Sequence, residues 1–144
     1  MDTISYEPIG TVSSPFDAPE AVPRPADETV DATGEIVLRE RFAPGLAGLS
    51  AFSHATVLAH LHEASEGRLT VSPEGVEERL GIFATSGPSR PNPIAETVVE
   101  IDGVEDGTLS VSGIDLIDGT PVLDLRPFAP KDDHLAGLER GWME

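Results

Sequence analysis

A proline-rich stretch beyond the middle of the chain carries the densest group of residues that could take part in chemistry. It runs Ser86-Gly87-Pro88-Ser89-Arg90-Pro91-Asn92-Pro93-Ile94. Proline fixes its own φ angle and biases the preceding residue toward extended geometry, so such a loop can hold side chains in fixed directions. Arg90 offers a planar fork of donors for a carboxylate or phosphate, and Asn92 offers donors and an acceptor for an amide or a base edge. The alternative is a stiff strand connection with a solvated arginine, and the sequence leaves both interpretations open.

Three aspartates form a second group, Asp115, Asp118 and Asp124. Asp118 precedes Gly119 and has an explanation as a turn residue, because Asp-Gly tolerates the positive φ angles of a tight turn. Asp115 and Asp124 lie among apolar residues on either side of that turn. Buried carboxylates need partners, so these two could hold an arginine or accept hydrogen bonds from a ligand. An acid/base pair or a two-carboxylate metal site is a nonspecific alternative.

A third group consists of His54, His60, His62 and Glu63. On a strand, His60 and His62 would point to the same face, as a pair of metal ligands requires. No further ligand stands at a recognisable zinc spacing, so satisfied or exposed histidines are the preferred interpretation and no metal site is predicted. No Ser–His–Asp triad can be identified, because a triad is defined by geometry and not by order in the sequence.

Short strands separated by glycine and proline turns must position these groups. Asp118-Gly119 predicts a hairpin between the last two strands. The segment 42–50 contains one proline and two glycines and predicts at most a short helical turn, whereas 54–62 could be a strand or a helix. We expect strands at 4–12, 34–39, 54–62, 81–85, 94–101, 109–117 and 122–128, and a further edge pairing at 68–71.

This pattern favours an all-β, mainly antiparallel fold with long loops and few short helices, either a sandwich or a small barrel. The proline-containing segment 17–33 is long for a loop in a compact domain. A Rossmann fold is disfavoured, because the chain has no Gly-x-Gly-x-x-Gly after a strand and no helical run of suitable length between strands. A P-loop is absent as well.

The length of 144 residues suits one domain, and the absence of cysteine excludes disulfides, thiolate metal sites and a cysteine nucleophile. No apolar run reaches the roughly 20 residues that span a bilayer, so we expect no membrane partner. The first residues, Met1-Asp2-Thr3-Ile4-Ser5, do not resemble a secretory signal, and we expect a cytoplasmic protein.

The charge balance is the strongest compositional feature. The chain has 26 acidic and 9 basic residues, for a net charge of −17, yet 39% of its residues are hydrophobic. This predicts a folded domain with an acidic surface, and we hypothesise a halophile's cytosol, where salt screens the self-repulsion. Nonspecific DNA binding is disfavoured because a large basic patch cannot be built. RNA binding in high salt stays open, through shape, stacking and hydrogen bonds.

Two motifs in these groups point to a family. Gly81-Ile82-Phe83-Ala84-Thr85 precedes Arg90-Pro91-Asn92-Pro93-Ile94, and Asp-Gly-Thr-Pro-Val-Leu-Asp follows at 118–124. With residues 9–16 and 49–54, they resemble the TsaA/TrmO-like family in collinear order over nearly the whole chain. The resemblance implies a β-barrel over residues 1–130, followed by a charged tail at 131–144, and usually a homodimer. It further implies binding of S-adenosyl-L-methionine without a Rossmann fold, and methylation of tRNA on the exocyclic nitrogen of threonylcarbamoyl-adenosine, next to the anticodon.

The resemblance also implies roles for particular residues. Arg90 would position substrate or phosphate, and Asn92 would orient the base or its carbamoyl group. No general base can be identified, although Asp118 is a candidate in addition to its turn role. The implied contacts to S-adenosyl-L-methionine are Pro23, Arg24, Pro25, His62, Glu63, Ser86, Glu96, Ser112, Gly113, Ile114 and Asp115.

The sequence departs from the family pattern at five positions in and just after the proline-rich loop. Ser86 stands where arginine is usual, Ala95 where glycine is usual and Glu96 where leucine is usual, and Gly87 and Thr97 each stand where serine is usual. The first hypothesis remains a tRNA methyltransferase. The departures motivate a second, a diverged noncatalytic paralogue that binds an adenosine-like ligand or RNA. A structural dimer without a ligand is least favoured, because the Arg-Pro-Asn-Pro loop is intact.

Overall fold

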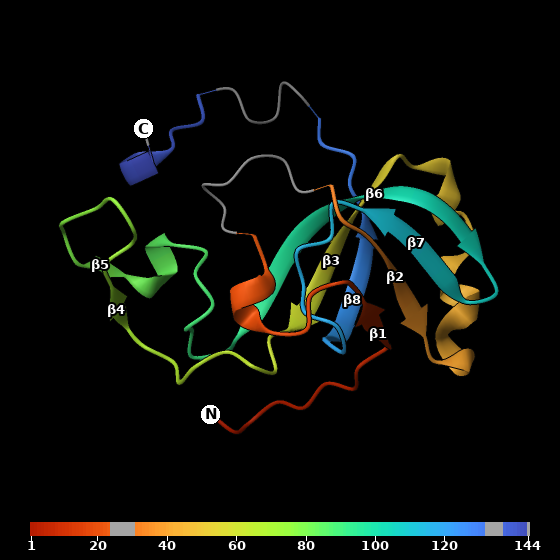
Figure 1. The fold of residues 1–144 in the computed structure, drawn as a ribbon, viewed down its shortest axis with the longest axis horizontal. Helices are drawn as coiled ribbons and strands as arrows, with labels where there is room; N and C mark the ends of the chain where they lie inside the picture. Colours follow the sequence, from red (N-terminus) through yellow and green to blue (C-terminus); the bar gives the residue numbers. More distant parts are fainter. Residues whose placement is uncertain (24–30, 132–136, 144) are drawn as a thin grey trace.

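Six antiparallel strands close into a barrel in the computed structural model, which describes residues 1–23, 31–131 and 137–143 (Figure 1). The order around the barrel is β1-β2-β7-β6-β3-β8, and every neighbouring pair is antiparallel. The prediction of an all-β, mainly antiparallel barrel is confirmed. The strands are β1 Gly10–Ser13, β2 Thr33–Leu38, β3 His54–His60, β6 Ile94–Glu105, β7 Thr108–Ser112 and β8 Pro121–Pro127.

An excursion between β3 and β6 leaves the barrel and carries its own small sheet. β4 Thr70–Val71 pairs with β5 Leu80–Gly81, and the excursion lies to the left of the barrel in Figure 1, with the C-terminal end of the chain beside it. The predicted strand at 81–85 is wrong beyond its first residue, because the chain turns there into a 3₁₀ segment. The 3₁₀ segments are η1 Pro19–Ala21, η2 Glu40–Leu46, η3 Leu49–Ala51, η4 Ile82–Ala84 and η6 Gly141–Met143.

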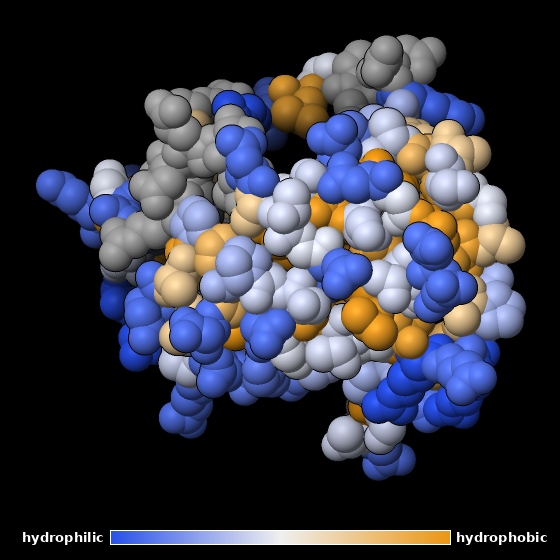
Figure 2. Space-filling model, turned by 45° about the vertical axis from the view of Figure 1, so that its right-hand side comes forward, coloured by the Kyte–Doolittle hydropathy of each residue, from blue (hydrophilic) through white to orange (hydrophobic). Residues whose placement is uncertain are grey.

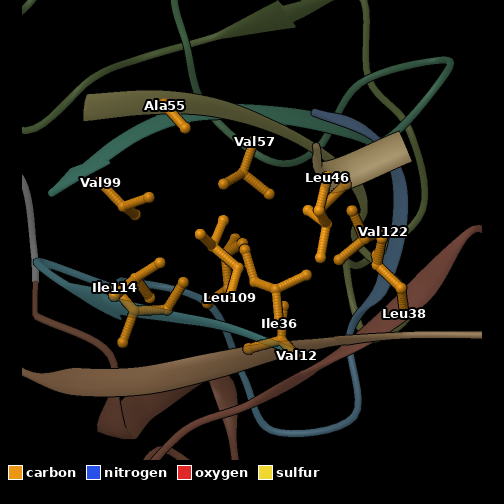
Figure 3. Packing of buried hydrophobic residues seen from close by; sticks show 13 residues of the cluster. Val12, Ile36, Leu38, Leu46, Ala55, Val57, Val99, Leu109, Ile114 and Val122 are labelled. Atoms are coloured by element: carbon orange, nitrogen blue, oxygen red, sulfur yellow. The ribbon is translucent and has the colours of Figure 1, made fainter. Parts of the chain in front are cut away.

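The barrel interior is filled by aliphatic side chains at alternate strand positions. Ile36 of β2, Leu109 of β7 and Val57 of β3 are fully buried there (Figure 3). Burial of one such side chain contributes about 1.5–3 kcal/mol. Leu46 of η2 reaches the cluster on one side and Ile114 on the other. The loops that carry these two residues are thereby fixed to the barrel.

The hairpin predicted at Asp118-Gly119 is wrong, because β7 ends at Ser112 and pairs with β2 and β6, whereas β8 pairs with β1 and β3. The chain contains two other Asp-Gly pairs, at 102–103 and 106–107, and the pair at 106–107 makes the hairpin. Asp106 and Gly107 have φ angles of 50° and 74° and connect β6 to β7. Two consecutive positive φ angles match the twist of paired strands in a two-residue turn.

Strand boundaries differ from prediction at three other places. The first strand starts at Gly10 instead of residue 4, and β3 ends at His60, with no helix at 54–62. β6 continues past residue 101 to Glu105, because an irregularity between Ile101 and Gly103 absorbs the glycine that had suggested a turn. The short helical turns expected at 42–50 are present as 3₁₀ segments.

The surface shown in Figure 2 is largely hydrophilic, with smaller hydrophobic patches between the polar residues. Of the described part of the chain, no helix has the length and apolar character needed to cross a membrane. Because charged side chains are seldom fully buried, the net charge of −17 must be carried mostly by groups in contact with solvent.

This charge predicts that salt stabilises the fold. We expect the thermal unfolding midpoint to rise between about 0.1 M and about 1 M KCl, because the screening length falls from roughly 10 Å to roughly 3 Å. Circular dichroism melts measure the shift. NaCl of equal ionic strength should produce the same rise, since screening does not depend on the identity of the cation. An unchanged or higher midpoint in dilute buffer would contradict the halophile hypothesis.

Candidate functional site

Four segments that are far apart in sequence meet around one cavity at the barrel. They are the turn around η1, the residues just after β3, the proline-rich loop at Pro88, and the connection between β7 and β8. The cavity has a volume of about 430 Å³, within the range of small-molecule sites, roughly 300–1,000 Å³. We call it the main cavity. Its lining residues are Pro19, Val22, Leu61, His62, Glu63, Ala64, Ser65, Pro88, Asp115, Leu116, Ile117 and Thr120.

The connection after β7 is bent toward the main cavity by Gly113 and anchored by Ile114. Gly113 has a φ angle of 85°, which side-chain-bearing residues rarely adopt. The backbone N–H groups of Gly113 and Ile114 both donate to the carbonyl of Ala32, at 2.8 and 3.2 Å. The Ile114 side chain is 0% exposed within the core cluster. These contacts fix the backbone on which Asp115 follows.

The far end of the same connection is held by hydrogen bonds to the segment after β1. The backbone N–H of Ser14 donates to Oδ1 of Asp118 at 3.0 Å, and the Ser14 hydroxyl donates to the carbonyl of Leu116 at 2.6 Å. The buried hydroxyl of Thr120 donates to the carbonyl of Ile117 at 2.5 Å. The turn role predicted for Asp118 is confirmed. Asp118 itself is exposed, between two residues that line the main cavity.

Asp115 is the residue with the most informative geometry. Its Oδ1 is buried and has no hydrogen-bond partner in the described structure, although the residue lines the main cavity. A buried, unpaired carboxylate oxygen costs free energy unless a partner is supplied. A bound molecule with a cationic or hydroxyl group would supply it. The apolar neighbours Leu116 and Ile117 offer contact surface for a hydrophobic ring.

His62 and Glu63 reach the main cavity from the end of β3. The N–H of Leu61 donates to the carbonyl of Pro93 at 2.7 Å, which ties this segment to the end of the proline-rich loop. The prediction that His60 and His62 share a strand face is wrong, because the strand ends at His60. His60 lines a different hollow together with Asn92. Within the described residues, no group of three potential ligands could hold a metal ion.

The proline-rich loop is rigid, and Arg90 is part of the reason. The Nη1 of Arg90 donates to the carbonyls of Thr85 and Gly87, at 2.6 and 3.2 Å. The side chain is thus bonded across its own loop, and the interpretation of Arg90 as merely solvated is wrong. Ser86 is exposed and faces away from the main cavity, into a hollow on the other side of the loop.

Among the described residues, the remaining sequence-predicted contacts do not line the main cavity. Pro23 adjoins the lining residue Val22, while Arg24 and Pro25 fall outside the described residues. The Ser112 hydroxyl donates to Oδ2 of Asp102 at 2.6 Å. Glu96 is exposed on β6, opposite Leu58 of β3. The structure therefore gathers His62, Glu63 and Asp115, and leaves Ser86, Glu96 and Asn92 elsewhere.

Several lining residues escaped the sequence reasoning. Leu61, Leu116 and Ile117 form apolar walls, and Thr120 closes the turn below them. The sequence feature that could have identified them is an apolar residue next to a predicted site residue: Leu61 precedes His62-Glu63, and Leu116 follows Asp115. The expected strands at 54–62 and 109–117 place these residues in strand interiors, because the sequence does not mark that β3 ends at His60 and β7 at Ser112.

A second hollow, of about 480 Å³, lies between η2, η3 and β8 and is lined almost wholly by apolar residues. Its one acid, Asp124, already accepts hydrogen bonds from the Leu125 N–H at 2.9 Å and from Arg126 Nε at 3.1 Å. Among the described residues that line this hollow, no buried polar side-chain atom lacks a hydrogen-bond partner. The main cavity has such an atom and is therefore the better candidate site.

A small closed antiparallel barrel whose loops enclose a cavity with an unpaired carboxylate oxygen is a ligand-binding barrel. Comparison with known proteins identifies the family. The sequence model of the tRNA-methyltransferase O N-terminal domain matches residues 11–134, and the chain belongs to this family.

Individual relatives agree with this assignment. An S-adenosyl-L-methionine-binding protein of Archaeoglobus fulgidus is 41% identical over 92% of this chain and 95% of its own length. The tRNA (adenine(37)-N6)-methyltransferase of Escherichia coli K12 is 39% identical, over 94% of this chain and 62% of that protein. A crystal structure of TrmO superposes with a TM-score of 0.80 at 40% identity, covering 97% of this chain and 64% of that one. The chain thus spans less than two thirds of the two longer relatives.

Proposed function

We propose that this protein transfers a methyl group from S-adenosyl-L-methionine to tRNA, at the exocyclic nitrogen of threonylcarbamoyl-adenosine next to the anticodon. Membership of the family and the names of the relatives support the reaction class. The observation that carries the proposal is the unpaired Oδ1 of Asp115 in a cavity of about 430 Å³. This oxygen can accept a hydrogen bond from a bound molecule or pair with a cationic group on it.

The residues of the main cavity fit S-adenosyl-L-methionine. That cofactor supplies an electrophilic methyl group on a positively charged sulfur. Asp115 and Glu63 provide negative charge toward a bound cation or hydroxyl group, and Leu61, Leu116 and Ile117 provide apolar walls for a planar ring. Such a preorganised cavity can catalyse methyl transfer by aligning the donor with the acceptor and by placing charged groups beside them.

Three further residues have proposed roles in the reaction. Arg90 keeps the proline-rich loop in shape through Thr85 and Gly87, and so positions the side of the site that receives the substrate. Asn92 orients the base or its carbamoyl group from an exposed position after that loop. Asp118 is the candidate acceptor of the proton from nitrogen, at the edge of the main cavity.

The departures from the family pattern do not remove the proposed site. Ser86 faces the hollow on the other side of the loop, and Glu96 is exposed on β6. Neither lines the main cavity, and this supports a retained cofactor site over a degenerate one.

We also propose that the protein acts as a homodimer. On β6, Ile94 and Val98 are 46% and 40% exposed on the same outward face. Ile4 and Tyr6 of the N-terminal segment are exposed as well, and with Ile94 they line one hollow. Apolar groups gathered in this way are typical of a surface that is covered by a partner.

The function is tested by calorimetry and a methylation assay on the full chain in concentrated KCl. We expect micromolar binding of S-adenosyl-L-methionine, and methyl transfer to tRNA that carries threonylcarbamoyl-adenosine but not to tRNA with plain adenosine at that position. Light scattering on the same sample reports the oligomeric state. Absence of binding up to millimolar cofactor, in a sample shown to be folded, would overturn the proposal in favour of the noncatalytic paralogue.

A further inference from the structure

A second concave surface lies directly behind the wall of the main cavity. It has a volume of about 610 Å³ and is formed by the proline-rich loop, the β4 region and the C-terminal segment. We call it the loop–tail hollow. Pro88 lines both this hollow and the main cavity. The Pro88 side chain would therefore stand between a molecule bound in the main cavity and one bound in the loop–tail hollow.

The loop–tail hollow presents aromatic rings to solvent. Phe83 of η4 is 77% exposed, although its neighbour Ile82 is fully buried. Trp142 of η6 is 39% exposed, and its Nε1 donates to the carbonyl of Ala84 at 2.6 Å. That hydrogen bond fixes the indole to the loop while leaving part of its ring accessible. Exposed rings held in place are the usual platform for unstacked nucleic-acid bases.

The proline-rich side of the loop–tail hollow carries no acidic residue, although Glu74 follows its β4 side and Glu139 precedes its C-terminal side. The chain has 26 acidic residues among 144, yet no Asp or Glu occurs from Gly81 to Ala95, a stretch that includes Arg90. Phosphate groups are repelled least where acids are missing. Residues 42–62 are also free of acids, but the hollow that Phe42 and Phe52 line shares no lining residue with the main cavity.

The wall of the loop–tail hollow is already formed in the protein without RNA. Arg90 Nη1 bonds to Thr85 and Gly87, and the Arg68 N–H donates to the carbonyl of Ser89 at 3.0 Å. The Thr85 hydroxyl donates to the carbonyl of Ile82 at 2.9 Å. A preformed wall lowers the ordering cost of binding.

We propose that the loop–tail hollow binds an unstacked base of the RNA substrate, stacked on Phe83 and Trp142, beside the base that is methylated in the main cavity. This inference rests on the proposed function, because the RNA is the methyl acceptor of that reaction. It adds two residues to the specificity-determining surface, one from the loop and one from the C-terminal segment.

The test compares Phe83→Ala with Phe52→Ala, an exposed phenylalanine of the other acid-free surface. We expect Phe83→Ala to raise the KM for tRNA by about 5-fold to 150-fold, the range for loss of one base–aromatic stack, with kcat and the Kd of S-adenosyl-L-methionine little changed. Phe52→Ala should leave all three constants near those of the wild type. Equal KM values for the two variants would overturn the inference even if the wild type methylates tRNA.

A second readout does not depend on catalysis. Trp142 is the sole tryptophan of the chain, so its fluorescence reports on the loop–tail hollow alone. We expect a single-stranded anticodon-loop RNA to quench this fluorescence in the wild type, and a higher RNA concentration to be needed in Phe83→Ala. Quenching without cofactor binding or methylation would contradict the proposed function and support the base site. Methylation without quenching would support the proposed function and contradict the base site.

Discussion

Replacing Asp115 with asparagine is expected to weaken the binding of S-adenosyl-L-methionine by about 10-fold to 100-fold. Within the described part of the chain the buried Oδ1 has no hydrogen-bond partner, so a charge-assisted contact with the bound molecule is the interaction that would be lost. Such contacts are worth about 1.5–3 kcal/mol. The unliganded variant should be as stable as the wild type or more stable, because an uncompensated buried charge is removed. Calorimetry and urea unfolding measure the two effects.

The opposite signs of these two effects distinguish a binding residue from a structural one. Asp124→Asn is the matched control, since Asp124 is a partly buried aspartate outside the main cavity with partners in Leu125 and Arg126. It should lose a little stability and no cofactor affinity. If Asp115→Asn unfolds more easily and binds the cofactor normally, Asp115 has a structural role and not the proposed one.

Replacing Ile114 with alanine is expected to lower the free energy of unfolding by about 2–5 kcal/mol. Ile114 is 0% exposed, and its removal leaves a cavity in a core that cannot fully close around it. The same residue anchors the segment that carries Asp115, so cofactor affinity should fall as well. Urea titration in molar KCl measures the stability, because urea adds no ionic screening of its own.

Val37→Ala provides the comparison for this core substitution. Val37 is 45% exposed on β2, away from the proposed dimer surface, and we expect its replacement to cost less than about 1 kcal/mol. A loss at Ile114 no larger than the loss at Val37 would mean that the connection after β7 is not anchored through this side chain.

The strands were largely predictable, and their partners were not. Alternation of apolar residues located β2, β3, β6 and β8 within a few residues. It gave no information on which strands pair, and the chain has three Asp-Gly pairs, of which the one at 102–103 lies inside β6 and the one at 106–107 makes a hairpin turn. At Asp106-Gly107 both φ angles are positive, whereas Gly119 donates its N–H to the carbonyl of Val12 and joins the turn to β1. The choice between them depends on contacts across the barrel that local sequence does not encode.

The candidate site was predictable in part, because residue type singled out His62, Glu63 and Asp115 and the family resemblance grouped them as contacts to one ligand. His62, Glu63 and Asp115 do line one cavity, although more than 50 residues separate the first from the last. Ser86 and Glu96 do not, because Pro88 stands between the loop's two sides and because Glu96 points outward from β6. A motif gives the order of residues along a loop. Which side of the loop each one faces is set by the fold.

Closure of the barrel has a consequence for solubility. A strand edge is a template for pairing with another chain, and charged side chains usually keep such edges apart. In concentrated salt this repulsion is screened and no longer protects the molecule. Each of the six barrel strands here is paired on both sides, and the small second sheet has strands of only two residues. Protection against aggregation is thus built into hydrogen bonding, which salt leaves intact, and does not depend on charge.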